Sequence, residues 1–195
     1  MARFTVTGPA TGTCDDGALR DGILVRDGAH LDLSFAAVTH IHNTPLAACF
    51  RVGHGITIGD PFGTIATATI EHSDISDYGG TGIIAFGDGS LVDISENVIT
   101  GAGLSTIVAT SGIEFVFGAA GTISHNVISG NSCGSPDLGC GTDYLTQFQI
   151  AGIQAGGPGT VITHNEIYDN QVGIYAFDGA QSSHNKLVNN HFFGL

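Results

Sequence analysis

The chain of 195 residues contains 30 glycines, no tryptophan and only 12% charged residues, which favours a compact fold with many tight turns over disorder. Five basic residues stand against 18 acidic ones, so the formal charge is −13. Proteins that bind nucleic acids or anionic membranes need clustered basic residues, so both are excluded as partners. The negative charge of the protein also repels acidic polysaccharides. A neutral glycan or a protein is therefore the expected partner. The sequence contains no run of about 18 apolar residues, so no membrane-spanning helix is expected.

A glycine followed by isoleucine recurs along the chain, and it marks the start of a short predicted strand. The pairs are Gly22-Ile23, Gly55-Ile56, Gly82-Ile83, Gly112-Ile113, Gly152-Ile153 and Gly173-Ile174, and Gly194-Leu195 repeats the pattern at the end. Side chains alternate after each pair, as they do on a strand. Prolines fall only between these segments, and no stretch has helical periodicity. Strands that recur without intervening helices indicate a solenoid.

A second motif, an asparagine within an apolar frame, lies between successive glycine pairs. It is clearest at residues 123–128, 162–167 and 182–187 and weaker at 70–75 and 94–99. The two motifs together resemble the parallel β-helix repeat of the pectin-lyase-like superfamily over residues 22–195. This resemblance implies an all-β fold, a single-stranded right-handed parallel β-helix of about six or seven coils. We expect a single domain over residues 1–195.

Polar residues recur in columns. Asn97, Asn126, Asn165 and Asn185 form one column and Asn131, Asn170 and Asn190 another, and stacked amides of this kind predict structural ladders. His125, His164 and His184 share a third column with His72 and Glu96. Metal binding is one interpretation of the histidines. An outward-facing turn position is the favoured one, because a straight column makes a poor tetrahedral site.

Three insertions, residues 44–55, 102–112 and 132–150, fall between the second motif and the next glycine pair. They therefore leave the helix along one side, where they can wall a groove or simply cover the core. Residues in or beside them whose side chains suit a neutral sugar are His40, His42, Asp143, Tyr144, Gln147 and Gln149. The nearest candidates for catalytic work are His54, Asp60 and Arg51.

The segment Gly53-His54-Gly55 resembles the Gly-His-Gly segment of polygalacturonases, and Asp15-Asp16 resembles their aspartate pair. The chain departs from that family in three ways. Asp16 and His54 are 38 residues apart, the family's upstream Asn-Thr-Asp segment is missing, and no basic residue lies between Arg51 and Lys186 to form its Arg-x-Lys segment. A pectin-type hydrolase is therefore a minor alternative.

The cysteines, the outward apolar residues and the end of the repeat predict the location and the partners of the protein. Cys133 and Cys140 flank a short loop and predict a disulfide, which implies an extracellular or cell-surface location. Outward positions after the glycine pairs predict an apolar strip for an adjacent domain or a second copy, formed by Leu24, Ile84, Phe86, Val116, Tyr175 and Phe177. The repeat stops mid-pattern at residues 191–195, so we expect a longer natural protein or a partner over that end.

No cofactor is expected. Two acidic groups offer calcium as an alternative to plain solvated turns, although neither has the spacing of a calcium loop; they are Asp15, Asp16 and Asp21, and Glu71, Asp74 and Asp77. The leading functional hypothesis is an extracellular binding or structural scaffold that contacts glycan or protein. The alternative is a carbohydrate-active hydrolase or lyase with a loop-lined groove.

Overall fold

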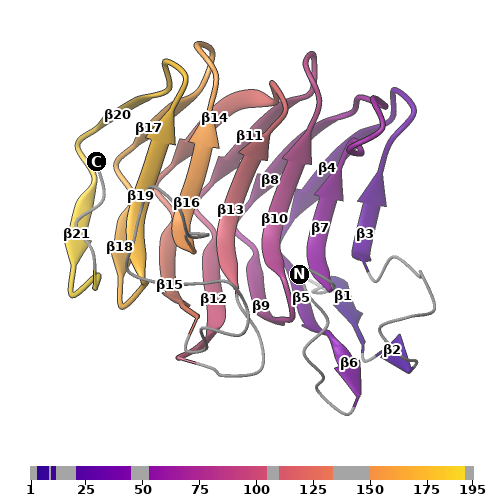
Figure 1. Ribbon diagram of the computed structural model, residues 1–195. Coiled ribbons are helices and arrows are strands. Elements are labelled where there is room, and N and C mark those ends of the chain that lie inside the picture. Colours follow the sequence, from indigo (N-terminus) through magenta and orange to yellow (C-terminus); the bar gives the residue numbers. More distant parts are fainter. Residues whose placement is uncertain are drawn as a thin grey trace.

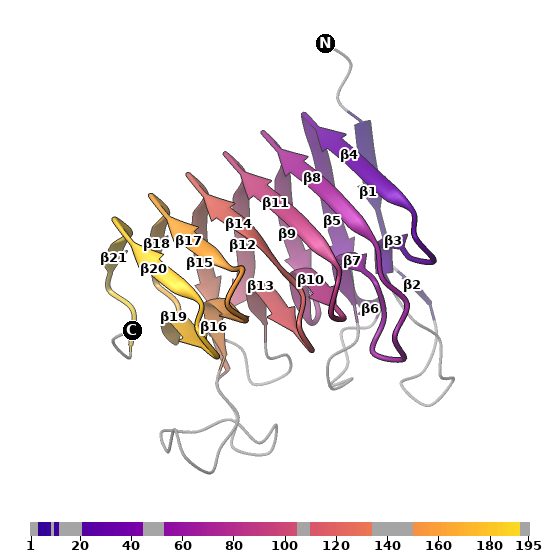
Figure 2. The same ribbon diagram turned by 90° about the horizontal axis from the view of Figure 1, so that it is seen from above.

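The computed structural model describes residues 4–8, 10–11, 21–44, 53–104, 110–133 and 150–191, which form three parallel sheets stacked into a solenoid (Figure 1). Each coil contributes one strand to each sheet in turn, and successive coils follow one another along a single axis (Figure 2). No helix occurs in these ranges, so none can cross a membrane there. The predicted all-β parallel β-helix is confirmed.

Sheets I, II and III follow the order in which the chain passes through them from Asp21 onward. Sheet I contains β3 (Asp21–Val25), β7 (His54–Ile58), β10 (Thr81–Phe86), β13 (Ser111–Val116), β16 (Ala151–Gly156) and β19 (Val172–Phe177). Sheet II contains β4 (His30–Ser34), β8 (Thr67–Glu71), β11 (Leu91–Ser95), β14 (Ala120–Ser124), β17 (Val161–Thr163) and β20 (Gln181–Ser183). Sheet III contains β1 (Phe4–Thr7), β5 (Ala36–Ile41), β9 (Asp74–Tyr78), β12 (Val98–Gly103), β15 (Val127–Asn131), β18 (Glu166–Tyr168) and β21 (Lys186–Val188). A short pair, β2 (Ala10–Thr11) and β6 (Asn43–Thr44), lies outside these sheets.

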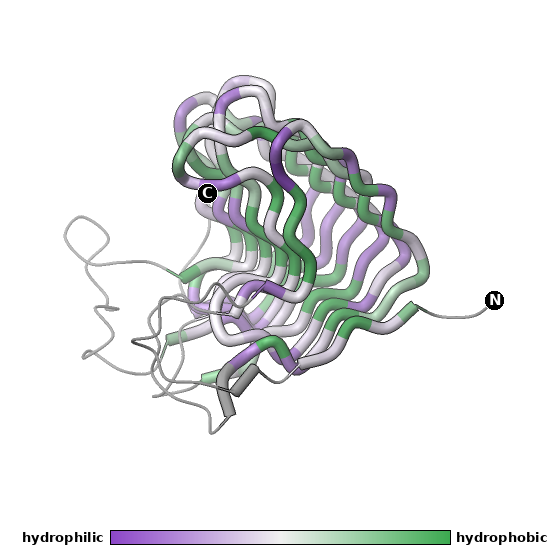
Figure 3. The backbone as a smooth tube through the Cα atoms, turned by 90° about the vertical axis from the view of Figure 1, so that its right-hand side faces the viewer, coloured by the Kyte–Doolittle hydropathy of each residue, from purple (hydrophilic) through white to green (hydrophobic). Residues whose placement is uncertain are grey.

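The glycine–isoleucine repeat sets the register of sheet I. Its isoleucines pair from coil to coil, and Ile56, Ile83 and Ile113 are fully buried. Hydrophobic residues, coloured green in Figure 3, recur at the same place in successive coils, and the buried ones form one core cluster. Each glycine is needed because neighbouring coils approach closely: a Cβ on Gly82 would lie 2.7 Å from the next glycine's carbonyl oxygen.

The asparagine columns form hydrogen-bonded ladders, as predicted. Asn126 Nδ2 donates to the carbonyl oxygen of Ile94 at 2.9 Å and to Asn165 Oδ1 at 3.0 Å. Its own Oδ1 accepts from the backbone N–H of Asn97 at 3.0 Å. The same pattern joins Asn131 to Asn170. Each amide therefore satisfies buried backbone groups of a neighbouring coil, which is a structural role.

The histidine column occupies the turn from sheet II to sheet III. His125, His164 and His184 have φ between 55 and 57°, in the left-handed region that histidine tolerates better than most residues. Their rings stack with centroids 5.1 Å apart and planes within 5° of parallel. Among the described residues, no three His, Cys, Asp or Glu side chains are grouped to hold a metal ion. The geometry therefore favours the turn interpretation of the column.

Candidate functional site

The candidate site is a hollow of about 300 Å³ on the outer face of sheet I. Ile84, Glu114 and Gln154 form one column on this face, because they pair in register and alternate with the buried isoleucines. The hollow is lined by His54, Pro61, Thr81, Ile84, Phe86, Glu114, Val116, Phe117 and Gln154. It thus combines apolar walls with a few converging polar groups, the usual composition of a ligand site.

Glu114 is the most unusual residue of the hollow. Its side chain is only 4% exposed, yet no hydrogen bond or ion pair joins it to another residue in the described ranges. Gln154, one coil away, has a buried side-chain oxygen that likewise has no hydrogen-bond partner there. Buried polar groups are nearly always paired in folded proteins. The Gln154 oxygen is such an exception, and the unpaired Glu114 carboxylate lies in the next coil of the same hollow, so both groups can bind a ligand there.

His54 contributes a hydrogen-bond donor to the hollow. The backbone N–H of Thr81 donates to His54 Nδ1 at 3.1 Å, so the neutral ring carries its hydrogen on Nε2. This contact fixes the orientation of the ring through the parallel pairing of β7 with β10. His54, a catalytic candidate from the sequence, lines the hollow, and its catalytic role stays a prediction. Its geometry suits hydrogen-bond donation better than proton abstraction.

Aromatic side chains extend the hollow into a longer groove. A second hollow of about 490 Å³ shares Val116 and Phe117 with the first and continues past Phe177. Phe117 is 72% exposed and stacks on Phe86 with ring centroids 6.2 Å apart. Tyr175 and Phe177 form another ring pair at 5.5 Å. We call the two hollows together the sheet I groove; it crosses several coils and offers exposed ring faces.

The predicted apolar strip lies on this face but is not continuous. Ile84 is 4% exposed, whereas Leu24 and Tyr175 are about 40% exposed. The polar residues Glu114 and Gln154 interrupt the strip between Ile84 and Tyr175. Sequence reasoning missed both polar residues. Their position directly after the glycine–isoleucine pairs was the available signal, since that position faces outward in every coil.

Asp60, a catalytic candidate from the sequence, has a structural role in the turn after β7. Its Oδ1 accepts the backbone N–H groups of Phe62 at 2.8 Å and Thr64 at 3.1 Å. These hydrogen bonds, chiefly the one from Thr64, hold the pKa of the Asp60 carboxyl below its ordinary value. Asp60 is not among the residues that line the groove. The neighbouring Pro61 lines it instead.

His40 and His42 gather around one carboxylate on sheet III rather than at the groove. Asp77 Oδ2 lies 3.4 Å from His40 Nε2, and Asp77 Oδ1 lies 3.3 Å from His42 Nε2. The hydroxyl of Thr39 lies 3.2 Å from His40 Nδ1. Thr39, His40 and Asp77 together resemble a catalytic relay of hydroxyl, imidazole and carboxylate. The same contact between neighbours recurs at Thr163 and His164, at 2.8 Å. It is therefore a local feature of a histidine in this turn conformation.

Other residues singled out in the sequence lie outside the described residues. These are Arg51, Asp143, Tyr144, Gln147 and Gln149, together with Asp15, Asp16 and Cys140. The Cys133–Cys140 disulfide therefore stays a prediction. Of the acidic groups considered for calcium, Asp21 accepts a hydrogen bond from the Thr57 hydroxyl at 2.8 Å, and burial raises its pKa. Asp77 contacts the two histidines described above.

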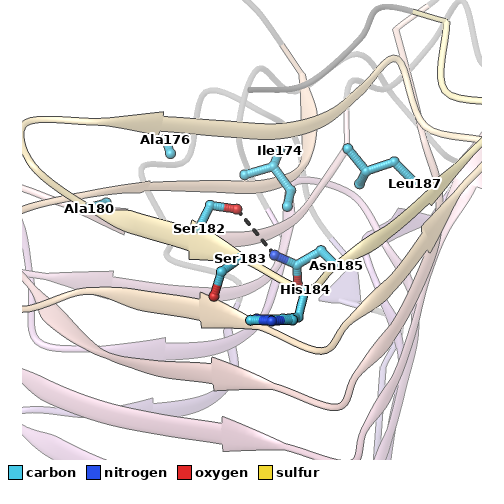
Figure 4. Close-up of a pocket in the computed structure, with 8 residues that line it drawn as sticks. All are labelled: Ile174, Ala176, Ala180, Ser182, Ser183, His184, Asn185 and Leu187. Atoms are coloured by element: carbon cyan, nitrogen blue, oxygen red, sulfur yellow. Dashed lines mark hydrogen bonds between the residues drawn. The ribbon is translucent and has the colours of Figure 1, made fainter.

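A third hollow, of about 450 Å³, lies at the last described coil (Figure 4). Its apolar wall consists of core positions of that coil, Ile174 and Leu187. Ser182 stands where the previous coil has Ile162, and its hydroxyl accepts from Asn185 Nδ2 at 3.1 Å. None of its lining residues is a buried polar group without a partner. This hollow is the exposed end of the core, and the sheet I groove is the better ligand site.

Comparison with known families decides the assignment of the fold. A family model described as a right-handed beta helix region matches residues 54–195, well over half of the chain. The chain belongs to the right-handed β-helix family. The predicted handedness is thereby confirmed, and the resemblance to the pectin-lyase-like superfamily is consistent with it. No curated protein and no solved structure shows significant similarity to this β-helix.

Proposed function

We propose that this right-handed β-helix is an extracellular binding scaffold that holds a glycan chain in the sheet I groove. The observation that carries the proposal is a hollow in which two polar side chains without a described hydrogen-bond partner, Glu114 and Gln154, lie beside exposed ring faces such as that of Phe117. The hydroxyl groups of a sugar can hydrogen-bond the polar groups, and its flat C–H faces can stack on the aromatic rings. The groove also crosses several coils, which suits an extended chain of repeating units.

A glycan suits the groove better than an extended peptide does. The strands that carry the groove, β10, β13 and β16, each have a parallel partner on both sides. Their backbone groups are therefore already paired, and a peptide cannot add to the sheet as an extra strand. Recognition must come from side chains, as it commonly does for sugars.

Turnover of the glycan is the second candidate, because His54 and Glu114 line the same hollow. Most glycoside hydrolases use two carboxyl groups about 5–10 Å apart. Among the described residues, Glu114 is the only carboxylate that lines the 300 Å³ hollow, and the Asp60 carboxylate accepts hydrogen bonds from its own turn. Binding without turnover is therefore the primary proposal.

The proposal is tested with a glycan array, followed by titration calorimetry on each hit. Phe117→Ala should weaken binding about 3- to 10-fold through loss of ring stacking, while Phe4→Ala, which removes another exposed ring from sheet III, should not. Product analysis on the same samples decides between binding and turnover. Silence across the array, with light scattering that shows a dimer or larger assembly, would favour a protein partner and refute the proposal.

A further inference from the structure

Glu114 has no cationic partner in the described part of the chain. A carboxylate at a hollow with apolar walls forms its strongest interactions with an opposite charge that also donates hydrogen bonds. Only two of the five basic residues lie in the described ranges, and both are engaged elsewhere. Arg26 Nε lies 3.2 Å from an Asp27 oxygen, and Lys186 Nζ lies 2.7 Å from Glu166 Oε1. Neither contacts Glu114.

The surroundings of Glu114 match an ammonium group. The apolar side chains of Ile84 and Val116 line the hollow beside it, and Phe86 and Phe117 add a stacked ring pair. Aromatic faces attract cations, and a carboxylate gives an ammonium its strongest hydrogen bonds. The formal charge of −13 also attracts cationic ligands from solution. A neutral hydroxyl can donate one hydrogen bond to Glu114 but leaves its charge uncompensated.

We propose that the sheet I groove selects a glycan that carries a free amino group, a glucosamine-type sugar whose ammonium binds the Glu114 carboxylate. This inference rests on the proposed function and narrows its ligand class, from the neutral glycan expected from the sequence to a cationic one. Gln154, which lines the same hollow, offers hydrogen bonds to the hydroxyl groups of the same or adjacent sugars. The aromatic residues contact the sugar faces.

The test compares three β-1,4-linked tetrasaccharides that differ only at carbon 2 of each ring. The probes are the tetramers of glucosamine, N-acetylglucosamine and glucose, titrated calorimetrically at physiological salt. The wild-type protein should bind the amino form tightest. Glu114→Gln keeps the shape of the side chain and removes its charge, so the amino form should lose about 10- to 100-fold in affinity while the glucose form changes little.

The matched control is Glu96→Gln, which removes one negative charge from the exposed turn column far from the groove lining. Equal losses in both variants would show unspecific attraction of a cation to an acidic protein and would overturn the inference. Circular dichroism melts of both variants report whether the fold is kept.

The outcomes separate this inference from the proposed function. Equal binding of all three tetramers, unaffected by Glu114→Gln, would refute amino-sugar selectivity and leave glycan binding standing. No binding of these probes or of any array glycan would refute both. Binding of a lysine-rich peptide with the same dependence on Glu114, but not of the glucosamine tetramer, would assign the carboxylate to a protein partner and overturn the inference.

Discussion

Replacing Asn126 with alanine removes one rung from the buried amide ladder. Asn126 is fully buried and connects three coils. In the variant, the backbone N–H of Asn97 loses the Asn126 Oδ1 acceptor at 3.0 Å. The carbonyl oxygen of Ile94 loses the Asn126 Nδ2 donor at 2.9 Å. The Asn97 N–H left without a partner costs about 1–3 kcal/mol, and each of the lost hydrogen bonds to Ile94 and Asn165 costs about 0.5–1.5 kcal/mol, so the expected loss is about 2–6 kcal/mol. That is a large share of the usual stability of a domain.

The assay is urea unfolding of both proteins, followed by far-ultraviolet circular dichroism. The matched control is Asn185→Ala, in the last described rung, where the side chain is half-buried. Asn185 Oδ1 accepts the N–H of Asn165 at 2.9 Å, and Asn185 Nδ2 donates to Ile162 and Ser182. Water reaches this half-buried rung and can replace part of these hydrogen bonds, so the expected loss is smaller, about 1 kcal/mol. Equal losses in the two variants would refute the reasoning, since burial of the orphaned groups is what distinguishes them.

Three further predictions concern the core and the first coil. Gly82→Ala should lower the free energy of unfolding by about 1–3 kcal/mol in the same urea assay, because the new Cβ would lie 2.7 Å from a carbonyl oxygen of the next coil. Tyr78→Phe should cost about 1–2 kcal/mol, because the Tyr78 hydroxyl donates to buried Asn131 Oδ1 at 2.7 Å; a gain in stability would contradict this. Burial raises the pKa of Asp21, offset in part by the hydrogen bond from Thr57, so stability falls as pH rises through the folded-state pKa of Asp21. Asp21→Asn should therefore match the wild type in melting temperature at acid pH and exceed it at neutral pH, and an equal difference at both would count against burial as the cause.

The fold could be read from the sequence because its determinants repeat. Isoleucines such as Ile56 and Ile83 alternate with outward positions and recur once per coil, so strand, face and stacking follow from period and spacing. The ladder role of Asn126 also followed, because an amide repeated at the same place in each coil can bond only its neighbours along the axis. The strands and the amide ladders depend only on residues in the adjacent coil, which the repeat itself supplies.

The candidate site could be read only in part. His54 was found through its glycine-flanked motif and does line the groove. Asp60 looked equally suitable in the sequence, yet its oxygen accepts hydrogen bonds from its own turn. His40 and His42 lie beside Asp77 on another sheet. That contact depends on the left-handed backbone of His40 and Asp77 near the ends of β5 and β9, which the sequence does not reveal. Composition and spacing do not distinguish these three situations.

By itself, the sequence determined that this protein is a right-handed parallel β-helix with amide ladders, because a repeated local pattern can bury its apolar faces only by stacking on itself. The tertiary structure alone decided that Glu114 and Gln154, which occupy an ordinary outward position, line a hollow with exposed rings and have no side-chain partner among the described residues. Whether an outward side chain meets water or a concave surface depends on residues from several coils at once. No local period in the chain encodes that curvature.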